Sequence, residues 1–117
     1  MTKYTISVSD PWFDHIRRGA KRYEGRLYRG LPRYVRPGDI LTIYRETPDS
    51  KEPNSFSCII EDVLRFETFE ESMKVLPLDQ ILPGIKSISE GIKIYETFAK
   101  VTTQKQFGVC LIQVGPL

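Results

Sequence analysis

Four charged residues close together in the chain have the side chains best suited to chemistry: Lys21, Arg22, Glu24 and Arg26. A lysine removed from water has a lowered pKa and can act as a base, and in its charged form it can bind phosphate. A carboxylate accepts hydrogen bonds from the exocyclic amine of cytosine or adenine, and the planar arginine fork holds phosphate at two points. These residue types make Lys21 and Glu24 the candidate catalytic residues and Arg22 and Arg26 candidate ligand-binding residues.

The same residues also fit a structural role, in which Lys21 is an ordinary surface lysine and a Glu24–Arg26 pair tethers the segment. A strand over residues 21–28 would place alternate side chains on opposite faces, with Lys21 on one face and Glu24 and Arg26 on the other. Glycines on either side of Lys21 would let a ligand approach closely.

Further candidates lie outside this stretch. Trp12 and Tyr44 are the aromatic residues best placed to stack on a nucleobase, Arg45 follows Tyr44 directly, and Ser9 could bind a substrate oxygen. Trp12 also fits an apolar core, and Ser9 also fits a strand edge or a cap. With one histidine, two distant cysteines and no serine–histidine arrangement, the chain matches neither the common zinc patterns nor a triad, so we expect no metal or other cofactor.

Short elements must position these residues. Alternating or apolar patterns predict strands over residues 4–8, 21–28, 40–44, 55–66 and 107–114. Helices are predicted from Asp10, as a cap, to Gly19, and after capping boxes that begin at Thr68 and Ser87. The strands are mostly not separated by crossover helices, which predicts an α+β fold: a small mixed β-barrel of about five strands with short helices outside it. The proline-containing segment 76–86 would cover the cleft or pack behind it.

The chain length, the apolar runs and the cysteine count limit the class of protein. The 117 residues fit a single domain over residues 1–117. No apolar run is long enough to span a membrane, and the N-terminus lacks the apolar core of a signal peptide. Cys58 and Cys110 do not make a disulfide framework. We therefore expect a cytoplasmic protein with reduced thiols and no membrane partner.

The net charge of +2 conceals a strong asymmetry. Residues 16–45 contain nine basic and two acidic side chains, whereas residues 46–117 contain seven basic and eleven acidic ones. Eight of the nine bases are arginine, the residue that both grips phosphate and stacks on bases. This favours an anionic partner, nucleic acid first, over a merely solvated basic face.

Three ordered motifs resemble one known family. Residues 19–27, GAKRYEGRL, resemble the G-x-K-x-x-E-x-R signature of the ASCH domain, a branch of the PUA-like superfamily. Residues 9–16 resemble the helix before that signature, and residues 37–40 the Gly-Asp turn after it. Residues 82–95, followed by 107–109, are similar to a block found in small single-domain ASCH proteins.

The resemblance implies a small β-barrel with flanking helices and a cleft beside the signature strand. The family is associated with RNA binding, and some members are RNA-processing enzymes or amidohydrolases that deacetylate acetylated cytidine. In those amidohydrolases a lysine, a threonine and a glutamate are taken as catalytic. Lys21 matches the lysine, and Glu24 stands in place of the threonine.

Two functions in particular fit these observations. The first is a basic cleft beside residues 21–28 that binds RNA, a nucleotide or a modified nucleoside. The second is a metal-independent hydrolase that acts on a nucleobase amide, of the acetylated cytidine type, or on RNA. Whether the protein is an enzyme stays open at this point, as does a third reading in which the basic face binds an acidic protein.

Overall fold

The computed structural model describes residues 1–117. Its strands are β1 (Lys3–Val8), β2 (Tyr23–Leu27), β3 (Ile40–Arg45), β4 (Ser55–Phe66) and β5 (Val109–Pro116). Its helices are α1 (Trp12–Arg17), the 3-10 helix η1 (Leu31–Arg33), α2 (Phe69–Val75), α3 (Leu78–Ile81), α4 (Ile88–Glu96) and α5 (Val101–Phe107). None of the helices combines the length and the apolar character needed to span a bilayer.

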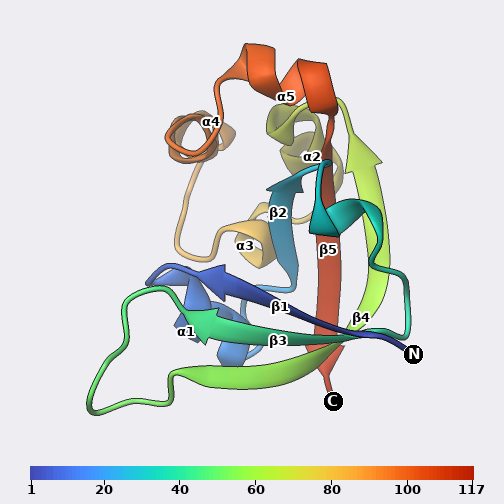
Figure 1. The fold of residues 1–117 in the computed structure, drawn as a ribbon. Helices are drawn as coiled ribbons and strands as arrows, with labels where there is room; N and C mark the ends of the chain where they lie inside the picture. The colour runs from blue at the N-terminus through green and yellow to red at the C-terminus, as the bar shows by residue number, and fades with distance from the viewer.

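All five strands belong to one mixed sheet, in the order β1-β3-β4-β5-β2. β1 pairs with β3 in parallel, and the other pairs are antiparallel. β4 is long and bends (Figure 1), so that residues 55–59 pair with β3 and residues 58–66 pair with β5. The pairing with β5 has a register irregularity between Ile60 and Asp62. Such a bulge bends and twists a strand. The sheet therefore curls into a half-barrel whose two edge strands are β1 and β2, which confirms the predicted α+β, PUA-like class.

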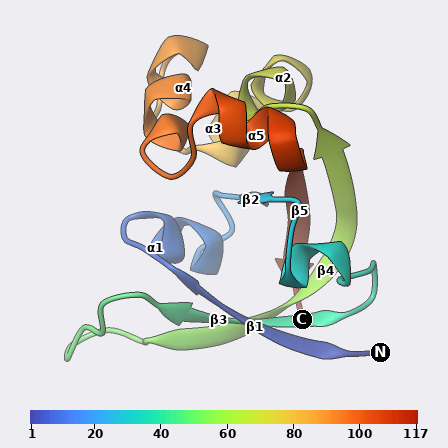
Figure 2. The ribbon, with the colours of Figure 1, turned by 45° about the horizontal axis from the view of Figure 1, so that its top comes forward.

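The helices pack against the half-barrel in two places. α2, α3, α4 and α5 gather at one end, near β2 and the adjoining ends of β4 and β5, whereas α1 lies apart from them, close to β1 (Figure 2). One core cluster joins α1 to the sheet through residues such as Phe13 and Ile43, and a second joins α2, α3 and α4 to the sheet through residues such as Phe69 and Leu111. Trp12 packs against both clusters, so the start of α1 lies where the two meet.

Local sequence signals place several element boundaries correctly. The hydroxyl groups of Thr68 and Ser87 accept hydrogen bonds from the backbone N–H groups of Glu71 and Glu90, which confirms both predicted helix caps. The strand predicted over residues 55–66 is confirmed in full. These elements depend on contacts within a few residues, which is why the sequence pattern finds them.

Three expectations about elements are wrong. β2 begins at Tyr23 rather than at residue 21, because the backbone N–H of Arg22 donates to the carbonyl of Gln80 instead of to β5. Asp10 does not cap α1, since its carboxylate pairs with Arg45. Helix α5 was not predicted, and it delays the last strand until Val109.

Candidate functional site

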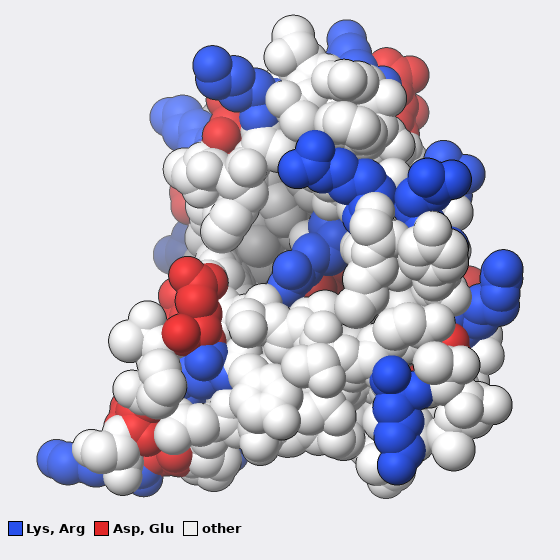
Figure 3. All heavy atoms as spheres, in the orientation of Figure 1, with Lys and Arg blue, Asp and Glu red and all other residues white.

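A cavity of about 530 Å³ lies at the seam between the two edge strands of the half-barrel. β1 and the residue after it line the cavity with residues 5–9, and β2 lines it with residues 24–27. The end of α4 and the turn after it supply Tyr95 and Phe98. The space-filling view shows a hollow on this face, with basic side chains in it and along its border (Figure 3). The volume is in the range of small-ligand sites.

Lys21 lies in this cavity and only 2% of it is exposed. Its Nζ donates hydrogen bonds to the carbonyl oxygens of Tyr23, at 2.6 Å, and Ile81. The same atom lies 3.9 Å from Oε1 of Glu24. Because Lys21 precedes β2, the strand alternation does not apply to it. The prediction that Lys21 and Glu24 lie on opposite faces is therefore wrong, and the structure brings the two side chains together.

Glu24 and Arg26 form the ion pair that their spacing predicts. Oε2 of Glu24 lies 2.8 Å from Nε of Arg26, and Glu24 is buried in the cavity wall. Nη2 of Arg26 donates to the carbonyl of Ser7 in β1 at 2.7 Å. Arg26 thus connects the two edges of the half-barrel while it holds Glu24 beside Lys21, so the pair has a structural role and also forms part of the cavity.

The environment of Lys21 alters its protonation. Burial lowers the pKa of Lys21 from 10.5 to about 8, although the nearby Glu24 carboxylate opposes this shift. Two of the three positions on Nζ face backbone carbonyls, and a neutral amine still has two N–H groups for them. The third position carries a proton or a lone pair. Lys21 can therefore serve as a cation at neutral pH and as a base at mildly alkaline pH.

Trp12 and Ser9 also line the cavity. Nζ of Lys21 lies 5.7 Å from the centre of the Trp12 ring, within reach of a cation–π contact. The half-buried indole of Trp12 packs on both core clusters and also borders the cavity, so a core role does not prevent it from facing a ligand. Ser9 sits just past the end of β1, where its carbonyl accepts a hydrogen bond from the N–H of Phe13.

Arg22 and Tyr44 do not line the cavity. Arg22 pairs with Glu61 on β4 at 2.8 Å and donates to the carbonyl of Val114 on β5. Tyr44 lies on β3 and is 47% exposed. The structure thus separates both residues from Lys21, and neither belongs to the ligand site that we propose below.

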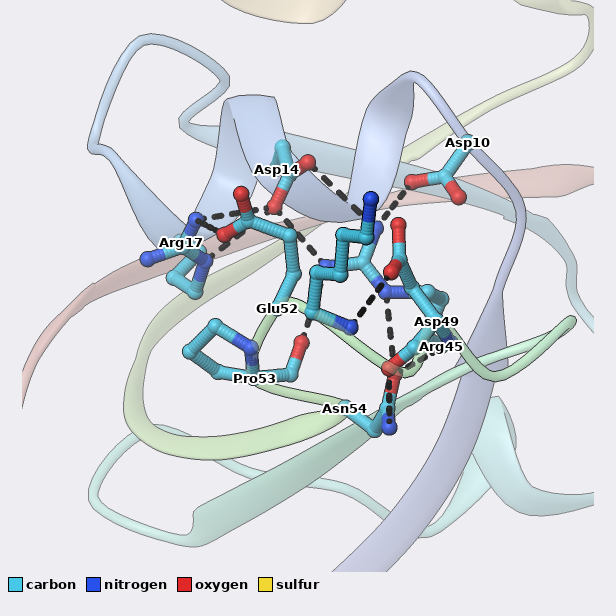
Figure 4. Close-up of polar contacts among 9 residues, drawn as sticks. Asp10, Asp14, Arg17, Arg45, Asp49, Glu52, Pro53 and Asn54 are labelled. Atoms are coloured by element: carbon cyan, nitrogen blue, oxygen red, sulfur yellow. Dashed lines mark hydrogen bonds and ion pairs between the residues drawn. The ribbon is translucent and has the colours of Figure 1, made fainter.

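Arg45 is buried elsewhere and has its own partners (Figure 4). Its guanidinium donates to the carboxylates of Asp10 and Asp14, to the side chain of Asn54 and to the carbonyl of Pro53. It also lies over the ring of Phe13, 4.3 Å from the centroid. The hydrogen bonds with Asp14 raise the pKa of Arg45 and lower that of Asp14. This is a structural network that joins α1 to the β3–β4 loop, outside the cavity.

The sequence analysis assigned no role in the site to three residues that line the cavity. Tyr95 is buried, its ring stacks on Phe69 with centroids 4.0 Å apart, and its hydroxyl has no hydrogen-bond partner. Arg29 is exposed and lies 4.8 Å from the centroid of Phe107, and Phe98 is 63% exposed. Helical spacing marks Tyr95 only as a core residue, because periodicity does not reveal which core residues border a cavity.

Fold and site together define a class of protein. A curled five-stranded α+β sheet with short helices, and with a buried lysine in a cavity at its seam, is a small PUA-like domain. Within this class the chain belongs to the ASCH domain family, whose model matches residues 6–113.

Two solved structures are similar over nearly the whole chain. The crystal structure of the hypothetical protein PH0355 is 30% identical with a TM-score of 0.84, and the match covers 99% of this chain and 100% of that one. The solution NMR structure of protein PF0455 from Pyrococcus furiosus is 29% identical with a TM-score of 0.75, covering 99% of this chain and 98% of that one. No curated protein matches the chain.

Proposed function

We propose that the cavity binds a single base of RNA, or a free or modified nucleoside, with the rest of the nucleotide held at its mouth. The observation that carries this proposal is the buried Lys21–Glu24–Arg26 cluster in the wall of a 530 Å³ cavity. Charged groups are rarely buried unless they are paired or used. Here they sit beside apolar walls, the usual construction of a ligand site.

Each part of a nucleotide has a matching part of the site. The apolar and aromatic walls, with Trp12 among them, suit a planar base. Lys21 and Glu24 offer a donor and an acceptor to its polar atoms. Arg26 and Arg29 line the same cavity and suit a phosphate near its mouth. Membership of the ASCH family, which is associated with RNA binding, supports the same assignment.

The test is binding of short single-stranded RNA at several salt concentrations. We expect an affinity that falls steeply with salt, as it does when basic side chains contact phosphates. Arg26→Ala should lower the affinity and the salt slope, the slope by about one unit. Arg22→Ala is the matched control, since Arg22 belongs to the same stretch but lies outside the cavity, and it should change the affinity by less than about twofold. Failure to bind any RNA or nucleoside at low salt would reject the proposal and favour an acidic protein partner.

A second candidate, hydrolysis of an amide on a nucleobase, is favoured by one observation. Lys21 has a pKa lowered to about 8 and lies 3.9 Å from the Glu24 carboxylate, which is an arrangement that suits acid–base chemistry near neutral pH. Mass spectrometry of acetylated cytidine and of RNA after incubation tests it. Loss of the acetyl group or RNA cleavage, absent in Lys21→Met, would establish an enzyme. Unchanged substrates with salt-sensitive RNA binding would establish a binding protein.

A further inference from the structure

The backbone of β2 presents its hydrogen-bonding groups alternately to β5 and to the open edge of the sheet. The N–H of Val114 donates to the carbonyl of Arg22, and the N–H of Tyr28 donates to the carbonyl of Gly108. In the antiparallel register of these strands, the even-numbered residues therefore pair with β5. The N–H and C=O groups of residues 23, 25 and 27 point the other way, towards the free edge of the sheet.

Gly25 differs from its two neighbours on this edge. The carbonyl of Tyr23 accepts from Lys21, and the carbonyl of Leu27 accepts from the N–H of Arg29. Neither the N–H nor the C=O of Gly25 forms a hydrogen bond elsewhere in the protein. Gly25 lines the cavity, so it has a backbone donor and a backbone acceptor side by side at the cavity wall, both without a partner.

Tyr95 adds a third unpartnered group at the same place. A Cβ atom built on Gly25 would lie 2.9 Å from Oη of Tyr95 and 2.8 Å from Cε1 of Phe69, so the hydroxyl lies directly against this glycine. The hydroxyl is buried and unpaired, which is uncommon in folded proteins. Burial, and secondarily the Glu24 carboxylate, raise the pKa of Tyr95, so that its hydroxyl remains a donor at neutral pH.

We propose that the backbone N–H and C=O of Gly25, together with the hydroxyl of Tyr95, bind the base-pairing edge of one unpaired nucleobase. A nucleobase carries a donor next to an acceptor on this edge, which is the complement of what Gly25 offers. The missing side chain at Gly25 lets the Phe69 and Tyr95 rings pack against the strand, which places the Tyr95 hydroxyl next to the free backbone groups of Gly25. The inference rests on the proposed function, and it specifies that the ligand must have a free base-pairing edge, so duplex RNA is excluded.

The experiment compares ribonucleosides with counterparts methylated on the base-pairing edge. Isothermal titration calorimetry would use uridine with 3-methyluridine and guanosine with 1-methylguanosine, and adenosine and cytidine with their dimethylamino counterparts. For whichever nucleoside the wild-type protein binds, we expect the affinity for the methylated counterpart to be lower by at least about tenfold. Tyr95→Phe keeps the stack on Phe69. It should weaken binding of the parent nucleoside roughly three- to tenfold.

A stability measurement separates recognition from folding. Without ligand, Tyr95→Phe should melt at the same temperature as the wild type or higher, because it removes a buried hydroxyl that has no partner. Tyr23→Phe, in the same core cluster but not in the cavity lining, is the control and should bind normally. Equal binding of parent and methylated nucleosides, or wild-type affinity in Tyr95→Phe, would overturn this inference and leave the proposed function standing. No binding of any nucleoside or RNA would overturn both.

Discussion

Two buried basic residues of this protein, Arg45 and Lys21, are about equally shielded from water but have different surroundings. Arg45 uses its guanidinium nitrogens on two carboxylates, an amide side chain and a backbone carbonyl, and an aromatic ring lies beneath it. Hydrogen bonding to Asp14 raises the pKa of Arg45. Nothing about this network calls for an additional ligand.

Lys21 has weaker compensation for its burial. Two backbone carbonyls accept from its ammonium, but the one carboxylate nearby lies 3.9 Å away and is also engaged by Arg26. Burial therefore outweighs the carboxylate and lowers the pKa of Lys21. Tyr95, whose buried hydroxyl has no hydrogen-bond partner, lines the same cavity.

The comparison teaches that burial of a charge does not by itself indicate function. A buried charge whose partners satisfy all its hydrogen bonds fixes the fold. A buried charge with a shifted pKa, beside a cavity and an unsatisfied polar group, is a candidate for ligand binding or catalysis. By this criterion Arg45 is a structural residue and Lys21 is the candidate for the function that we propose.

The largest effect that we expect in a test of this contrast is on stability. Arg45→Ala should lower the melting temperature by on the order of 10 °C, because the Asp10 and Asp14 carboxylates lose their common partner. RNA affinity, measured by fluorescence anisotropy well below the melting transition, should stay within about twofold of the wild type. A large loss of affinity in folded Arg45→Ala would contradict the division of roles.

A smaller effect, on a different quantity, is expected at Lys21. Lys21→Met should weaken RNA or nucleoside binding about tenfold, because it removes a charge-assisted donor from the cavity. The melting temperature should change by only a few degrees, because two effects on stability oppose each other. The substitution leaves the carbonyls of Tyr23 and Ile81 without their hydrogen-bond donor, but it also removes the cost of burying a charge. Titration and differential scanning calorimetry on one sample check both quantities. A Lys21→Met protein that binds normally would show that Lys21 is structural.

The smallest and most graded effect is the dependence on pH. If Lys21 binds as a cation, affinity should fall by up to about tenfold per pH unit above pH 8, as its proton is lost. If it acts as a base, the hydrolysis rate should instead rise through pH 8 and then level off. Lys21→Met should abolish either component, and a wild-type profile that is flat from pH 7 to about 9 would exclude both.

The pH dependence of the free energy of unfolding gives an independent check on the titration of Lys21. The pKa of Lys21 is lower in the folded protein than its ordinary value of 10.5, so the unfolded chain binds more protons between about pH 8 and 10.5. The contribution of Lys21 to the free energy of unfolding therefore rises with pH over that window. Denaturant unfolding of the wild type and of Lys21→Met, compared at pH 7.5 and about 10, measures the difference.

Much of the candidate site could be predicted from the sequence, but its boundaries could not. Of the residues singled out in the sequence, Lys21, Glu24, Arg26, Trp12 and Ser9 all prove to line one cavity. Arg22 belongs to the same stretch, yet its side chain turns towards β4 and β5. Nothing in the local pattern separates it from its neighbours, because the separation depends on Glu61, which lies 39 residues further along the chain.

What the sequence by itself determined are the features encoded by near neighbours: strands from alternation, helix starts from Thr68 and Ser87, and a basic segment over residues 16–45. Tertiary structure alone decided which basic side chains face the cavity, that β2 is an edge strand, and that Lys21 lies beside Glu24. The physical reason is range. A side-chain pattern specifies which face of a strand is apolar, but burial and protonation are set by what covers that face. For Lys21 that cover includes Ile81, which is 60 residues away.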